Sequence, residues 1–91
     1  MKPVLVTATP EVAGRMLVEL LLDYHAEIAD EDGTTTTIAI EPDEELKRGT
    51  VIYRVIQASR NVDQAFPHAR MYLVTEDGNR WRLPPPALEP D

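Results

Sequence analysis

The spacing of apolar residues in the first part of the chain predicts a strand followed by a helix. Residues 4–8 form a short apolar and β-branched run, which is typical of a strand. Thr9 and Pro10 then suit the N-cap and the first position of a helix that continues from Glu11. From there apolar residues recur at helical spacing and share one face. The residues on that face are Ala13, Leu17, Leu20, Leu21 and Tyr24, with Met16 at its border.

Two β-type runs, 25–29 and 34–40, follow with an Asp-Gly pair between them, which is a strong hairpin signal. A two-residue loop would set Glu27 against Ile38, whereas a three-residue loop sets Ile28 against Ile38. Because the second register keeps apolar residues on one face, we expect the longer, bulged loop.

A second helix is predicted over residues 43–66, although its β-branched content also suits a strand. On a helical wheel its apolar residues cover one continuous side and its polar residues cover the other. A strand would place Arg54 on the same face as Ile52 and Ile56, so the helix is preferred. Pro67 stops it.

A second hairpin is predicted over residues 69–83, because Glu-Asp-Gly at 76–78 repeats the turn chemistry of 31–33. The element order is then β-α-β-β-α-β-β. This order predicts an α+β fold of ferredoxin-like type, with one antiparallel-rich sheet, both helices on one face and an additional C-terminal strand. We expect residues 1–84 to form this single domain and residues 85–91 to be a Pro-rich flexible tail.

Composition and charge exclude several classes of function. The chain has 91 residues, no cysteine and a net charge of −7. Without cysteine it has no disulfide framework, no thiol nucleophile and no Cys-based metal site. The negative charge argues against duplex nucleic acid and anionic membranes as partners. No apolar run approaches the length of a membrane span, so we expect a soluble cytoplasmic protein.

Candidate catalytic and metal-ligating residues are sparse. The acidic turn before Gly33 resembles a calcium loop only superficially, because the required pattern of ligands does not follow it. An enzyme hypothesis would need His25 or His68 beside Asp23 or Glu27 in a pocket, and nothing in the spacing brings them together. The only serine falls on the apolar side of the second predicted helix. We therefore predict no catalytic residue, metal site or cofactor.

The last hairpin provides the best candidate for a polar ligand site. Alternation with a three-residue loop turns Met71, Leu73, Trp81 and Leu83 towards the helices. Its opposite face then holds three arginines beside an aromatic ring, which suits an anionic ligand or a carboxylate-bearing partner. The simpler interpretation is the solvated face of an edge hairpin. The candidate ligand-binding residues are Arg70, Tyr72, Arg80 and Arg82.

A second candidate surface is apolar. Val18 and Leu22 lie outside the core side of the first predicted helix, and Leu46 and Tyr53 lie on the polar side of the second. Such a patch would mark a protein contact, and a two-fold homodimer would also stabilise a small domain. The leading hypothesis is a non-catalytic interaction and dimerisation module. The alternative is a sensing domain that binds an anionic metabolite through the arginine-bearing face.

Overall fold

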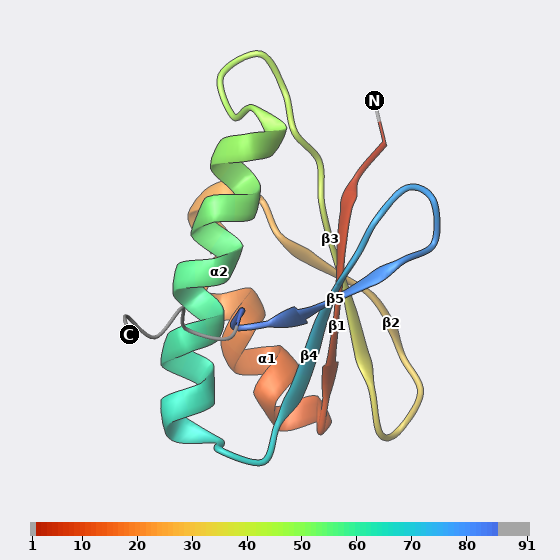
Figure 1. The fold of residues 1–91 in the computed structure, drawn as a ribbon, viewed down its shortest axis with the longest axis vertical. Helices are drawn as coiled ribbons and strands as arrows, with labels where there is room; N and C mark the ends of the chain where they lie inside the picture. The colour runs from red at the N-terminus through yellow and green to blue at the C-terminus, as the bar shows by residue number, and fades with distance from the viewer. Residues whose placement is uncertain (1, 86–91) are drawn as a thin grey trace, which may run out of the picture.

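Five strands, all paired antiparallel, form one sheet in the order β2-β3-β1-β4-β5 in the computed structural model, which describes residues 2–85. Both α-helices lie on the same face of this sheet, as predicted (Figure 1). The predicted domain boundary at residue 84 stays a prediction, and residues 86–91 of the expected tail lie outside the described residues. The elements are β1 (Val4–Thr9), α1 (Glu11–Leu20), the 3₁₀ helix η1 (Leu22–Tyr24), β2 (Glu27–Glu31), β3 (Thr36–Ile40), α2 (Arg48–Ala65), β4 (Arg70–Val74) and β5 (Arg80–Leu83).

The core lies between the sheet and the two helices. Alternate residues of the central strand β1 point into it, and those of β3 and β4 do the same, because successive side chains of a strand point to opposite faces. The helices contribute one buried stripe each. The largest fully buried apolar side chains are Val4, Val6, Leu17, Leu21, Ile38, Ile40, Val51, Val55, Val62 and Met71.

Helix α1 begins where the sequence predicts, but its cap differs. Pro10 is the N-cap, with extended backbone, and Thr9 remains the last residue of β1. The Thr9 hydroxyl lies 2.8 Å from the Thr35 hydroxyl instead of capping the helix, so the predicted role of Thr9 is wrong. The α-helix ends at Leu20, and Tyr24 belongs to the following 3₁₀ helix.

Helix α2 is a helix rather than a strand, as predicted, but it begins at Arg48 and not at residue 43. The Asp43 carboxylate accepts hydrogen bonds from the backbone N–H groups of Glu45 and Leu46, at 2.8 and 2.6 Å. The Asp43 N–H also donates to the Leu46 carbonyl at 2.9 Å. These bonds close a separate turn before the helix. Leu46 therefore lies in a loop and not on α2, contrary to the prediction.

The β2–β3 hairpin has the predicted pairing of Ile28 with Ile38, but a different turn produces it. The Asp32 N–H donates to the Thr35 carbonyl at 3.2 Å, which closes a two-residue turn in place of the expected three-residue loop. The register shifts between Ile28 and Asp30, so the bulge lies within β2.

Candidate functional site

The β4–β5 hairpin positions the predicted ligand-binding residues. Its turn has the predicted three residues and is closed by a 2.9 Å hydrogen bond from the Thr75 N–H to the Asn79 carbonyl. The register pairs Tyr72 directly with Arg82. Strand alternation then places one set of side chains on the face of the sheet away from the helices, which we term the open face. The hairpin residues on the open face are Arg70, Tyr72, Val74, Arg80 and Arg82.

The arginines of this hairpin lie on the same face as Tyr72 and next to it in the strand register. The Arg80 guanidinium carbon lies 5.7 Å from the Tyr72 ring centroid, within the range of a cation–π contact. Arg82 lies opposite Tyr72, and Arg70 lies two residues before it on the same strand. The ion pairs within residues 2–85 use other arginines. The three guanidinium groups are thus available to a partner that carries carboxylates.

The open face continues from this hairpin across the whole sheet. The strand registers align most side chains of the open face in two rows, and each row takes one residue from every strand. Arg70 pairs with Thr9 outside these rows. All residues from β3, β1 and β4 in these rows are half-buried, whereas those from β2 and β5 are exposed. The Leu5 row contains Glu27, Ala39, Leu5, Val74 and Arg80, and the Thr7 row contains Asp30, Thr37, Thr7, Tyr72 and Arg82.

An apolar groove lies on the other side of the hairpin, between it and α2. The groove has a volume of about 720 Å³. Trp81 turns towards the helix side, as predicted, yet its side chain is 63% exposed because it lines this groove rather than the core. The groove was not predicted. It is lined by Ile52, Ile56, Leu73, Thr75, Arg80, Trp81, Arg82, Leu83 and Pro85. Arg80 and Arg82 belong to the edge strand β5 and border both this groove and the open face.

The predicted apolar patch on the helices is divided between two environments. Val18 and Leu46 are half-buried and pack against the core. Leu22, in η1, and Tyr53, on α2, are 60% and 63% exposed. Helical spacing places Tyr53 on the same outer ridge as exposed polar residues one and two turns later, such as Gln57.

The residues of the enzyme hypothesis are not gathered into a pocket. His25 follows η1 with left-handed backbone at φ 60°, and His68 follows the end of α2. Both histidines are exposed, and neither lines the groove. In the part of the chain that the structure describes, no group of three or more acidic or histidine side chains is placed to hold a metal ion.

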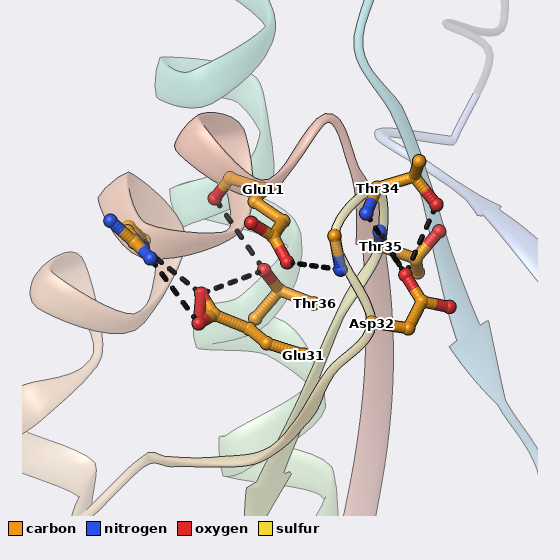
Figure 2. A network of polar contacts seen from close by, with 8 residues as sticks. Glu11, Glu31, Asp32, Thr34, Thr35 and Thr36 are labelled. Carbon is orange, nitrogen blue, oxygen red and sulfur yellow. Dashed lines mark hydrogen bonds and ion pairs between the residues drawn. The ribbon is translucent and has the colours of Figure 1, made fainter.

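The acidic turn between β2 and β3 forms a structural network instead (Figure 2). One Asp32 carboxylate oxygen accepts hydrogen bonds from the N–H groups of Thr34 and Thr35 and from the Thr34 hydroxyl, at 2.8–3.0 Å. The hydrogen bond from the Thr35 N–H is the largest of the effects that lower the pKa of Asp32. Because these donors belong to the turn itself, the Asp32 carboxylate has a structural role in holding the turn together.

The same network joins the turn to α1. The Arg15 guanidinium donates to both oxygens of Glu31, at 3.0 and 3.3 Å, and this hydrogen bonding lowers the pKa of the Glu31 carboxyl. The Gly33 N–H donates to the Glu11 carboxylate at 2.8 Å. The bulge in β2 makes the ion pair between Arg15 and Glu31 possible, because it places Glu31 beside Thr36 on the helix side of the sheet.

Comparison with protein-family models, curated proteins and solved structures finds no match to this chain. Within residues 2–85, neither helix combines the length and the apolar character needed to cross a membrane.

Sequence reasoning located the arginine cluster but missed the acidic ends of the two rows. The alternation of β4 and β5 is regular, so their faces follow from the sequence. In β2 the bulge reverses the alternation between Ile28 and Asp30, and a regular strand would have placed Asp30 on the helix side. The apolar–polar pattern alone therefore could not show that Glu27 and Asp30 share the open face.

Proposed function

We propose that this protein is a non-catalytic interaction module that acts in the cytoplasm and forms a homodimer through the open face of its sheet. The observation that supports this most directly is the group of three arginines beside Tyr72 on the open face, without a carboxylate partner in residues 2–85, in a chain of net charge −7. Arginine and tyrosine are enriched in protein interfaces, where each combines apolar contact with hydrogen bonding.

The open face suits this role better than the helices. Leu22 and Tyr53 remain exposed on the helix side, but Val18 and Leu46 already pack against the core. Single exposed apolar residues are normal on a protein surface. The half-buried centre of the open face is instead uncharged, and arginines border it, which matches an interface with an apolar centre and a charged rim.

The proposal includes the finer description of the fold as ferredoxin-like with an added strand. The strand order supports it. β3 lies between β2 and β1, and β1 lies between β3 and β4, so each β-α-β unit is split by a strand from the other. β5 extends this arrangement at one edge. The fold type carries no function by itself.

The experiment compares two tyrosines, one on each candidate surface. Sedimentation velocity over a concentration series measures self-association of the wild type, Tyr72→Asp and Tyr53→Asp. We expect Tyr72→Asp to raise the dimer Kd at least about tenfold, because it removes the aromatic contact at the centre of the interface and places there a charge that must lose its water. Tyr53→Asp should leave the Kd unchanged, and circular dichroism should show that both variants fold. The opposite result would place the interface on the helices, and a wild type that stays monomeric would overturn the proposal.

A second candidate function is binding of a small anion to the same arginines, favoured by the contact of Arg80 with Tyr72. In this function the negative charge that meets the arginines comes from a small ligand rather than from a protein surface. Thermal melts of the wild type and of Arg80→Ala/Arg82→Ala, with and without citrate, distinguish the two. For a sensor citrate should bind and raise the melting temperature of the wild type but not of Arg80→Ala/Arg82→Ala. For an interaction module without a ligand site it should act only as added salt does.

A further inference from the structure

The open face is electrically polarised from one edge to the other. The Leu5 row begins with Glu27 on β2 and ends with Arg80 on β5, and the Thr7 row begins with Asp30 and ends with Arg82. The residues between these ends are uncharged. Both rows therefore carry a carboxylate at the β2 edge and a guanidinium at the β5 edge.

The opposite charges are too far apart to neutralise each other within one molecule. Four strand spacings of about 4.8 Å separate the backbones of β2 and β5 by about 19 Å. This exceeds the Debye length of about 8 Å at physiological ionic strength. Within residues 2–85, moreover, none of the four charged side chains makes a hydrogen bond to a carboxylate or guanidinium of its own chain. Any oppositely charged partner of these four side chains therefore comes from outside the molecule.

We infer that a second copy of this chain covers the open face, related by a two-fold axis that is parallel to the strands and passes over β1. The inference rests on the proposed function and names the residues that the second copy contributes. A rotation about this axis reverses the strand order and preserves the position along each strand. It therefore places Arg80 over Glu27 of the second copy and Arg82 over Asp30 of the second copy. Symmetry repeats both pairs, so four ion pairs surround the interface.

The charges select this axis over the other simple choice. A two-fold axis in the same plane but perpendicular to the strands would place β5 over β5 and β2 over β2. Arginine would then face arginine, and carboxylate would face carboxylate, which is destabilising. Two sheets packed face to face lie about 10 Å apart, a distance that an arginine and a glutamate can span together. Leu5, Tyr72 and Val74 fill the centre between the ion pairs.

Charge reversal on each edge tests the pairing. Variant one is Arg80→Glu/Arg82→Glu, which makes both edges acidic. Variant two is Glu27→Arg/Asp30→Arg, which makes both edges basic. In homodimers of either variant like charges meet at every pair, so we expect the Kd of each to rise at least about tenfold over the wild type. A one-to-one mixture should associate again, because every pair then joins opposite charges.

A matched control separates pairing from net charge. Lys47→Glu/Arg60→Glu changes the net charge by the same amount as variant one, at exposed positions in the loop before α2 and on α2. We expect its Kd to stay within about twofold of the wild type, since surface charges far from the interface are screened. Circular dichroism verifies the fold of every variant.

The outcomes distinguish this inference from the proposed function. A wild type that remains monomeric overturns both. A dimer that Tyr72→Asp disrupts, but that neither edge variant weakens, leaves the proposed function standing and overturns the paired edges. If variant one fails to associate, variant two dimerises normally and the mixture gains nothing, the arginines meet another acidic surface, and the inference is also overturned.

Discussion

Gly14 lies at a close approach between α1 and the sheet. A Cβ atom at this position would lie 2.4 Å from the Cβ of Thr36, whose side chain is fully buried on β3. Two carbon atoms that are not bonded to each other do not come this close, so the helix and the strand would have to shift apart. The absence of a side chain at residue 14 thus sets the spacing between the first helix and the sheet.

The first prediction follows from this contact. Gly14→Ala should lower the free energy of unfolding by about 1–3 kcal/mol, because overpacking exceeds the gain in helix propensity. Gly49→Ala is the matched control, since a Cβ there meets no atom within 4 Å. It should be neutral or stabilise by up to about 1 kcal/mol. Urea unfolding followed by circular dichroism measures both, and a stabilised Gly14→Ala would show that the helix does not lie this close to β3.

At the scale of the element, the β2–β3 hairpin depends on one carboxylate. Asp32 receives its hydrogen bonds only when the turn is formed, and these bonds lower its pKa from the ordinary 3.8. The folded state therefore binds fewer protons than the unfolded state at acid pH. The ionised Asp32 carboxylate therefore stabilises the folded state. This stabilisation is fully present above the pKa of Asp32 in the unfolded state and is lost as the pH falls through its pKa in the folded state.

We therefore expect Asp32→Asn to destabilise the protein at pH 7 and to have progressively less effect as the pH falls below 3.8. The measurement is the melting temperature of the wild type and the variant from pH 7 to pH 2. Asp23→Asn, at an exposed position in η1 and outside the sheet, removes a carboxylate that accepts no hydrogen bond within residues 2–85, so its melting temperature at pH 7 should stay near that of the wild type. A constant difference between wild type and Asp32→Asn at every pH would contradict this account.

The sequence predicts the elements better than their ends. Helical periodicity identified both helices, and strand alternation identified the faces of β4 and β5, because each depends on many side chains together. The start of α2 and the cap of α1 depend instead on single hydrogen bonds. Asp43 could cap a helix or close a separate turn, and Thr9 could cap a helix or contact Thr35. Only the path of the chain decides between these alternatives.

At the scale of the molecule, the candidate site is assembled from strands that are far apart in the sequence. The arginine end lies within one hairpin and follows from local alternation. The acidic end depends on three further registers and on the bulge in β2. A bulge inserts one unpaired residue and leaves no mark in the apolar pattern of so short a strand. The polarity of the open face is therefore a property of the tertiary structure.

The packing of β5 against α2 leads to the last prediction. Trp81 and Leu83 lie two residues apart on the helix side of one strand, yet Trp81 is 63% exposed and Leu83 is 4% exposed. Both residues line the groove beside α2, but Leu83 is also part of the buried core, whereas Trp81 is not. Replacing a buried tryptophan by alanine typically costs about 3–5 kcal/mol. We expect Trp81→Ala to lower the free energy of unfolding by less than about 1.5 kcal/mol in urea unfolding, and Leu83→Ala to lower it by about 2–5 kcal/mol.

Equal losses would mean that the hairpin closes on α2 in solution and that the tryptophan belongs to the core. A small loss confined to Trp81→Ala would instead establish that the only tryptophan of the chain lines an open groove without contributing to the fold.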